Sequence, residues 1–494
     1  MIEKSRASRA PLAKEASPRL EDSTARYRLE PSGASILQPA VSGLRRARLR
    51  RAVAEAGEGR ADYDLRALKV LLVSFYFPPA GGGGVQRPLK FAAHLPALGI
   101  ETHVLAPDDP RWVHTGEELV PPTKAWVHRA RFVGPRSRKP AEELRGLEGF
   151  DRLLKHASLM PQRALVPDTK VTWNLTAIPA AIRIVREHAI DAVVTTSPPP
   201  SVHLVGAAVK KATGASWVAD LRDSITANPH RRDDSTAVRL KDKAAGSLAR
   251  LVARRADAVV TVSDAIAAEM RALDPAGPVQ TIPNGCDFED FEGLEYRPAD
   301  RLRITHAGSF FGKRTPRPFL TAFAESGVDA VARFVGDFRS SDREWADGLG
   351  LGDRLELVPY TTHRNALALE RDSEALLLLI PESGGRGRGV LSGKIFEYLA
   401  AERPILATVP PDGEAAKLLR ETGAGIVVAP EDTDGIREAL QGLEARWRAG
   451  SLNGTVLPDD LRERLSRRAR AEELVELLRS LPAREITTAA DSTP

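Results

Sequence analysis

The stretch Ile380–Pro404, IPESGGRGRGVLSGKIFEYLAAERP, combines the end of a strand, a glycine-rich loop and a helix in one short run. The residues Ala375–Ile380 form an unbroken apolar run, which is typical of a strand buried on both faces of a parallel sheet. The loop glycines leave backbone N–H groups uncovered near the start of a helix, where partial positive charge favours a bound phosphate. The stretch therefore predicts an α/β protein with the floor of a nucleotide site at this loop.

Charged side chains follow the glycines of this loop. We expect Glu397 one turn inside the helix, where a carboxylate can accept both hydroxyls of a ribose. A lone glutamate at such a position is more often a solvated residue on the helix face. The glycine loop and the neighbouring Lys394 favour the nucleotide-binding interpretation.

Length and composition indicate a soluble globular protein of two compact domains with extensions. The chain has 494 residues, of which 42% are hydrophobic and 28% charged, and no apolar run approaches the roughly 18 residues that span a bilayer. The first twenty residues lack the apolar region of a secretory signal, so we expect a cytoplasmic protein. The single cysteine, Cys286, excludes an intramolecular disulfide framework and reads as a small buried residue.

The charge distribution argues against nucleic acid as a partner. The net charge of +5 is modest for this length, and the basic residues are spread along the chain. The densest basic cluster is RRARLRR, Arg45–Arg51, for which a solvated tail is favoured over contact with an anionic membrane surface.

Hydrophobic patterning divides the chain into six segments. Buried-strand patterns such as LKVLLVSFYF, DAVVTTS, SWVADLR and AVVTVS recur in the first half, and RITHAGS, VARFVGD, ALLLLIP and PILATVP recur in the second. Between about 107 and 170 no clear period is visible. The predicted segments are a disordered basic extension over 1–66, a first α/β domain over 67–286, a linker over 287–301, a second α/β domain over 302–457, a terminal helix over 458–482 and a tail over 483–494.

A glycine run follows the first predicted strand. The stretch Phe77–Pro88, FPPAGGGGVQRP, resembles a phosphate cradle but lacks the glycine spacing and the downstream acid of a dinucleotide fingerprint. A structural turn explains this run about as well as a ligand loop does, so alone it is weak evidence.

A basic pair follows the first strand of the second domain. The stretch His306–Pro318, HAGSFFGKRTPRP, differs from a P-loop: three residues rather than four separate Gly308 from Gly312, and Arg314 stands where Ser or Thr would bind magnesium. Lys313 and Arg314 suit a diphosphate leaving group, whose growing charge they can neutralise without a metal. A solvated pair of loop charges is an equally common explanation.

An arginine and two aspartates end a predicted buried strand. In SWVADLRDSITANP, Ser216–Pro229, the residues Asp220, Arg222 and Asp223 lie at the carboxyl end, where α/β sheets place ligands. A purely structural Arg–Asp pair is the alternative.

Taken together, these motifs resemble the GT-B glycosyltransferases, specifically retaining family four. The resemblance covers about Leu68 to Leu481. The stretches that carry it are FPPAGGGG, TTSPPPS, VADLRD, TVSDAIAAEM, TIPNGCDF, HAGSFFGKR and GKIFEYLAAERPILA.

The resemblance implies two Rossmann-like domains facing across a cleft, with a C-terminal helix packing across both. The second domain would hold a nucleotide sugar and the first most of the acceptor. By this match Glu397 takes the ribose hydroxyls, Arg314 takes the diphosphate, and Gly83 and Gly84 approach the phosphates or the sugar. Arg222 and Asp223 would line the sugar and acceptor side.

Two positions depart from the family pattern, both in the donor site. Gly389 stands where the family usually has a second glutamate, and Ser309 stands where it usually has an arginine. The loop N–H groups, Glu382 or Arg386 would then contact the sugar. The candidate catalytic residues are Arg314, Lys313, Asp223 and Arg222, and the candidate donor-binding residues are Glu397, Lys394, Gly393, Ser392, Gly308, Ser309, Gly83, Gly84, Glu382 and Arg386.

The sequence thus predicts a transferase that moves a sugar from a nucleoside-diphosphate sugar to a hydroxyl of a saccharide, a lipid-linked saccharide or a small molecule. No cofactor is expected. Metal independence is expected because Lys313 and Arg314 supply the charge that a metal would otherwise provide, and because we expect no clustered carboxylates or histidines ready to bind one. A nucleotide-sugar epimerase of the same fold and a non-catalytic binding module remain alternatives.

Overall fold

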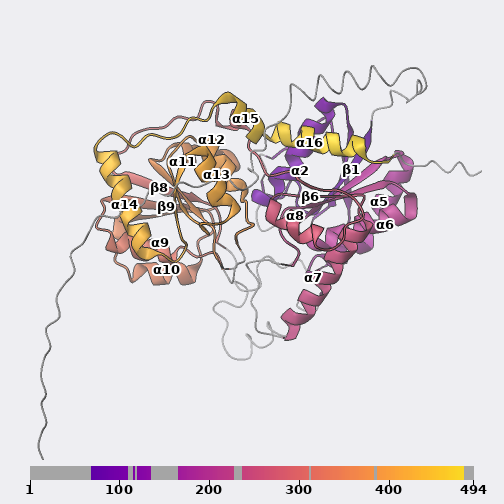
Figure 1. Ribbon diagram of the computed structural model, residues 1–494, viewed down its shortest axis with the longest axis horizontal. Helices are drawn as coiled ribbons and strands as arrows, with labels where there is room; N and C mark the ends of the chain where they lie inside the picture. The colour runs from indigo at the N-terminus through magenta and orange to yellow at the C-terminus, as the bar shows by residue number, and fades with distance from the viewer. Residues whose placement is uncertain are drawn as a thin grey trace, which may run out of the picture. The chain divides into compact units, whose positions relative to one another are not determined.

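The computed structural model describes residues 68–109, 115–116, 119–134, 165–226, 236–310, 313–382 and 387–482 (Figure 1). The predicted extension over 1–66 and the tail over 483–494 lie outside these residues. Within them, each half of the chain forms a parallel sheet with helices around it, as predicted.

In the described residues, the first sheet has seven strands in the order β3-β2-β1-β4-β5-β6-β7, and every neighbouring pair is parallel. All six residues of β4 and of β5 are buried, which confirms strands covered on both faces. Its strands are β1 (Lys69–Ser74), β2 (Glu101–Pro107), β3 (Trp126–Ala130), β4 (Ala192–Ser197), β5 (Ser216–Leu221), β6 (Ala258–Thr261) and β7 (Val279–Thr281).

Helices connect these strands as in a doubly wound sheet. Apolar residues of both the strands and the helices form the first core. The helices are α2 (Gly83–His94), α5 (Asn174–Glu187), α6 (His203–Thr213), α7 (Thr236–Arg255) and α8 (Asp264–Arg271), with short 3-10 turns η1 (Leu95–Leu98), η2 (Val171–Trp173), η3 (Pro200–Val202) and η4 (Phe288–Phe291).

The second sheet has six parallel strands in the order β10-β9-β8-β11-β12-β13. Its strands are β8 (Leu302–Ala307), β9 (Ala330–Val335), β10 (Leu355–Val358), β11 (Ala375–Leu379), β12 (Ile405–Thr408) and β13 (Gly425–Val428). Its helices are α9 (Arg317–Glu325), α10 (Ser340–Asp347), α11 (His363–Arg371), α12 (Gly393–Ala400), α13 (Glu414–Thr422) and α14 (Thr433–Arg448), with the 3-10 turn η5 (Gly352–Arg354).

The sequence showed no clear period between 107 and 170, yet β3 forms there as an edge strand. Its exposure alternates irregularly and Trp126 is exposed, because among the described strands only β2 pairs with it. An edge strand does not need the continuous apolar run that marked the central strands.

The predicted single terminal helix over 458–482 is wrong in one respect, because two helices form: α15 (Asp459–Leu465) and α16 (Arg467–Ser480). The chain is extended at Ser466, whose side chain caps α16 by accepting from the Ala469 N–H at 3.0 Å. The break pairs with an earlier segment: the Cys286 N–H donates to the Leu465 carbonyl, and the Arg467 N–H donates to the Cys286 carbonyl.

The two terminal helices contact different halves of the chain. Arg462 of α15 pairs with Glu402 after α12 at 2.9 Å, whereas α16 packs on α2 and η1. Apolar residues of α16 belong to the first core. The end of the chain therefore returns from the second half to the first.

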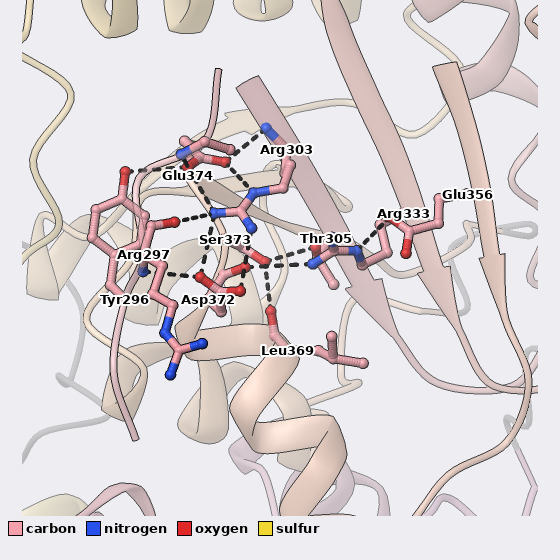
Figure 2. Close-up of polar contacts among 11 residues, drawn as sticks. Tyr296, Arg297, Arg303, Thr305, Arg333, Glu356, Leu369, Asp372, Ser373 and Glu374 are labelled. Atoms are coloured by element: carbon pink, nitrogen blue, oxygen red, sulfur yellow. Dashed lines mark hydrogen bonds and ion pairs between the residues drawn. The ribbon is translucent and has the colours of Figure 1, made fainter. Parts of the chain in front are cut away.

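A polar network ties the connector between the sheets to the amino ends of β8 and β11 (Figure 2). Arg303 pairs with Glu374 at 2.9 Å and with Asp372 at 3.2 Å. Glu374 also accepts from the Tyr296 hydroxyl at 3.2 Å, and Asp372 accepts from the Arg297 N–H at 2.9 Å. These bonds fix the connector against the second sheet.

In the part of the chain that the structure describes, no helix combines the length and apolar character needed to cross a membrane.

Candidate active site

A cavity of about 940 Å³ collects loops that follow the carboxyl ends of strands in both sheets. Parallel α/β sheets bind ligands at this edge because the connecting loops and helix N-termini meet there. Most of the predicted site residues line this cavity. They are Gly83, Gly84, Arg222, Asp223, Gly308, Ser309, Arg314, Ser392, Gly393, Lys394 and Glu397.

Among the described residues, two predicted ones do not line the cavity. Lys313 lies next to Arg314 in the loop after β8, and Glu382 pairs with Arg388 at 3.7 Å. Arg386 lies outside the described residues.

Two helix N-termini open onto the cavity. Gly82 before α2 has a φ of 89°, a backbone conformation that favours glycine, and no side chain caps this helix. A side chain added at Gly83 or at Gly393, the first residue of α12, would meet no atom within 4 Å. Neither helix has an acidic residue in its first turn, so the partial positive charge of both ends is available to an anionic ligand.

Lys394 and Arg314 bring positive charge to the start of α12. The Lys394 ammonium donates to the Ala307 carbonyl at the end of β8. A side chain at Gly308, whose φ is 142°, would collide with it. Burial lowers the pKa of Lys394, and the charge of Arg314 lowers it further. Such mutual repulsion is relieved when an anion binds between the two side chains.

Glu397 is held as a carboxylate. Its Oε1 lies 3.2 Å from His363 Nε2 and 3.4 Å from a guanidinium nitrogen of Arg467. Burial alone would raise its pKa, but the hydrogen bond to His363 and the charges of Arg467 and Lys394 lower the pKa to about 2. The carboxylate is therefore ionised at neutral pH, as an acceptor of ribose hydroxyls must be.

A second carboxyl group, that of Glu370 on α11, lines the same cavity. Glu370 is buried, and its Oε2 finds no hydrogen-bond partner among the described residues. Burial and the neighbouring charge of Glu397 raise its pKa well above the usual range. The site thus holds two glutamates whose pKa values move in opposite directions, that of Glu397 downward and that of Glu370 upward.

Arg222 and Asp223 bring an opposite charge pair to the first-sheet side. Arg222 donates to the Ser197 carbonyl at 2.5 Å and to the Gly84 carbonyl at 2.6 Å, while its second terminal nitrogen has no partner among the residues described. Asp223 lines the cavity and is exposed there. Loss of solvation raises the pKa of its carboxyl, and the positive charges of Arg222 and Arg314 oppose this rise.

Asp220, the third charged residue of this strand end, has a structural role. It forms a buried ion pair with Arg87 of α2 at 2.9 Å and accepts from the Thr196 hydroxyl at 2.7 Å. Arg87 also donates to the Ile282 and Pro283 carbonyls. The pair fixes α2, and with it the glycine run, against β5.

The structure gives a physical reason for the glycine at 389. A Cβ at this position would lie 2.8 Å from the Ala265 Cβ, and the Gly389 carbonyl accepts from the Ser263 hydroxyl at 2.8 Å. A glutamate at this position would therefore collide with Ala265. At the other departure, the Ser309 hydroxyl accepts from the Asp337 N–H at 3.1 Å.

Several cavity residues carried no signal in the sequence. His363, Glu370 and Arg467 come from helices whose motifs look ordinary, and Arg467 reaches Glu397 across 70 positions. Arg470, from the same helix as Arg467, also lines the cavity. A serine inside a run of helical residues, Ser466, was the one available hint that a helix begins there.

The expectation that the chain has no clustered histidines is wrong. Within the described residues one group of side chains has metal-ligand spacing, formed by His103, His128 and His188. None of the three lines the cavity.

The chain matches one family model. Residues 82–285 match the family described as "Glycosyl transferase 4-like domain". No curated protein matches the chain by sequence.

Solved structures share the fold over most of the chain. Sucrose-phosphate synthase from Thermosynechococcus elongatus aligns with a TM-score of 0.59 and 17% identity, covering 83% of this chain and 98% of that one. HepE from Anabaena, solved with UDP-glucose, gives 0.56 and 15%, with 84% and 100% covered. WaaG, a glycosyltransferase involved in lipopolysaccharide biosynthesis, gives 0.55 and 14%, with 83% and 100% covered. The predicted resemblance to GT-B glycosyltransferases is confirmed.

Proposed function

We propose that this chain transfers a sugar from a nucleoside-diphosphate sugar to an acceptor hydroxyl, with retention of configuration and without a metal ion. One observation carries the proposal: Arg314 and Lys394 meet the N-terminus of α12 in a cavity that also holds the ionised Glu397. This arrangement offers two cations to a diphosphate and a carboxylate to a ribose. The family match and the shared fold support the same activity.

The donor would span the second-sheet side of the cavity. Its ribose hydroxyls would donate to Glu397, which then exchanges or shares its contacts with His363 and Arg467. The diphosphate would lie between Arg314, Lys394 and the open N–H groups at Gly393. HepE, which has this fold, was solved with UDP-glucose, and this supports a nucleotide sugar as the ligand class here.

The sugar and the acceptor would lie toward Arg222 and Asp223. Asp223 can accept a hydrogen bond from a sugar hydroxyl, and the guanidinium nitrogen of Arg222 that lacks a described partner can donate one. Because a side chain at position 389 would collide with Ala265, the backbone of this loop would contact the sugar in place of a carboxylate.

The proposed step needs no covalent enzyme intermediate. The bond between the anomeric carbon and the diphosphate oxygen breaks, and its electron pair stays on the diphosphate. The acceptor oxygen bonds to the anomeric carbon from the same face, and its proton passes to the departing phosphate oxygen. Arg314 and Lys394 stabilise the charge that grows on the diphosphate, so they act most strongly in the transition state.

Two measurements test the activity. Nucleotide sugars are first screened by thermal shift, because a donor at a hundredfold excess over its Kd adds about 2.7 kcal/mol to the free energy of unfolding. The best ligand is then incubated with candidate acceptors. Free nucleoside diphosphate that appears only with acceptor supports transfer; release without acceptor indicates an epimerase, and binding without release indicates a binding module.

Metal independence and retention have separate tests. Turnover is expected to be unchanged in EDTA, because Arg314 and Lys394 supply the charge that a divalent ion would otherwise supply. Inhibition by EDTA that magnesium or manganese reverses would contradict this. NMR of the product's anomeric proton decides the configuration.

We further propose a saccharide or lipid-linked saccharide as acceptor, met in the cytoplasm or at the cytoplasmic face of a membrane. The support is the basic run Arg45–Arg51 in the sequence and the shared fold with WaaG, a glycosyltransferase involved in lipopolysaccharide biosynthesis. Salt-sensitive sedimentation with anionic vesicles, but not with neutral ones, tests the membrane contact.

A further inference from the structure

Three histidines from three elements of the first half lie together, away from the donor cavity. His103 is in β2, His128 is in the edge strand β3, and His188 directly follows α5. One ligand atom from each ring lies within 4.8 Å of the others. None of these residues takes part in the proposed transfer.

The strand register brings the first two rings together. His128 pairs with Leu105 in the sheet, two residues along from His103 on the same face of β2. The two rings stack with an interplanar angle of 7°, and His103 Nδ1 lies 2.9 Å from His128 Nε2. The His188 ring lies 4.5 Å from the His103 ring, centroid to centroid.

The second ring nitrogen of His103 contacts a carboxylate, as is usual for histidines that bind a metal. His103 Nε2 lies 3.1 Å from Glu101 Oε1, and Glu101 pairs with Lys69 at 3.0 Å. A carboxylate on one ring nitrogen fixes the tautomer, so that the other nitrogen presents its lone pair to a metal. Here that other nitrogen, Nδ1, faces His128.

A histidine binds a metal through a neutral ring nitrogen, so a lowered pKa favours binding. Burial lowers the pKa of His103 and of His128, and the neighbouring histidines lower both further. The other charged groups near the cluster, Arg183 and Glu187 of α5, pair with each other at 3.8 Å.

The spacing suits a tetrahedral ion after small movements. Zinc–nitrogen bonds of about 2.0–2.1 Å at tetrahedral angles place ligand nitrogens about 3.3 Å apart. The close pair at 2.9 Å must open slightly and His188 must move inward. His128 and His188 are half-buried, on an edge strand and at a helix end, so their rings can rotate and an ion can enter from solvent.

We propose that His103, His128 and His188 bind a divalent transition-metal ion, with zinc as the best fit and water as a fourth ligand. Three imidazoles without a thiolate suit zinc, cobalt, nickel or copper rather than magnesium or calcium. The ion would link β3 and the end of α5 to β2, and so stabilise the edge of the first sheet.

The test uses the full chain without a histidine tag, stripped with chelator and titrated with Zn²⁺ against a chromophoric competitor. One equivalent is expected to bind. His128→Ala and His188→Ala, which change half-buried positions, should each weaken binding at least about tenfold, and Glu101→Gln should weaken it about 10–100-fold. His94→Ala removes a half-buried histidine outside the cluster, and should leave Zn²⁺ binding unchanged.

Two further readouts distinguish this site from adventitious binding. Co²⁺ should give the intense visible absorption of a tetrahedral ion in the wild type and lose it in the double variant His128→Ala/His188→Ala. Zn²⁺ should raise the melting temperature of the wild type but not of that variant. Equal Zn²⁺ affinity in the wild type and the double variant would overturn the proposal.

Discussion

The two ends of the second sheet differ in how their charged side chains are paired. At the amino ends of β8 and β11, Arg303 forms ion pairs with Asp372 and Glu374, and the three residues hold the connector (Figure 2). At the carboxyl ends, Lys394 and Arg314 lie close enough to repel each other. The charges at the amino end are paired with one another, whereas the carboxyl end brings together two positive charges that an anionic ligand can neutralise.

The pKa shifts express the same contrast. At the amino end, Glu374 raises the pKa of Arg303; Arg303 overcomes burial and lowers the pKa of Glu374, so both stay charged. At the carboxyl end, burial lowers the pKa of Lys394 and raises that of Glu370, so the charged forms are disfavoured. Ionisable groups whose charged forms are disfavoured by their surroundings are typical of a functional site. Groups whose charged forms are stabilised by a partner are typical of a structural ion pair.

The largest expected effect comes from breaking the amino-end network. Glu374→Ala leaves Arg303 without its main partner and should cost about 3–5 kcal/mol of unfolding free energy, since one side of a buried pair is lost. Turnover per folded molecule should stay unchanged. Urea unfolding and steady-state kinetics measure the two quantities. Asp329→Ala, which breaks the exposed pair with Arg301, should cost at most about 1 kcal/mol.

The carboxyl end should show the reverse pattern. Arg314→Ala should lower kcat on the order of a hundredfold or more, because the charge that it meets grows as the diphosphate departs. Nucleotide binding should change less. Arg317→Ala, a nearby residue paired with Asp342, serves as the matched control in the same assay. If both variants turn over at the wild-type rate, Arg314 does not contact the leaving group.

Glu397 should affect binding more than turnover. Glu397→Gln keeps the shape and removes the charge-assisted bonds, so nucleoside-diphosphate binding should weaken by about 1.5–3 kcal/mol. A 2′-deoxyribose donor should no longer be discriminated against. Calorimetry measures the affinity, and Glu402→Gln, whose glutamate pairs with Arg371 and Arg462, is the control. Unchanged affinity would place the ribose elsewhere.

The smallest effect concerns Glu370 and depends on pH. Its raised pKa means that the folded state holds a proton that the unfolded state releases above a pH of about 4.5. The stability of the wild type therefore falls as pH rises from that value toward the folded-state pKa. Glu370→Gln removes this loss: the variant should match the wild type near pH 4 and exceed it near pH 8 in urea unfolding. The same difference at both pH values would contradict the assignment.

The sequence predicted most of the fold because central parallel strands have a local signature. The apolar run over 375–380 matches β11, and DAVVTTS contains β4. Glycines before helices also have a local signature, so the sequence pointed to Gly83 and Gly393, which line the cavity. The edge strand β3 was missed because, among the described strands, it has a sheet neighbour on one side only, and because it mixes exposed with buried residues.

The residues that complete the cavity could not be predicted in the same way. Arg467 and His363 matter because the fold brings them to Glu397, and nothing in their neighbouring residues reflects that distant contact. The histidine cluster was missed for the same reason: its members lie on two strands and one helix end, far apart in sequence. Physical partnership across a fold leaves no local pattern in one sequence.

The break at Ser466 has a consequence for how the protein is made. Arg467, the first residue beyond the break, contacts the carboxylate that we assign to the ribose. Chains are synthesised from the N-terminus, and early domains fold while later residues are still being added. Both sheets can therefore form on the ribosome while the cavity still lacks Arg467. Under the proposed function, full nucleotide affinity would require Arg467, which is added to the chain after both sheets.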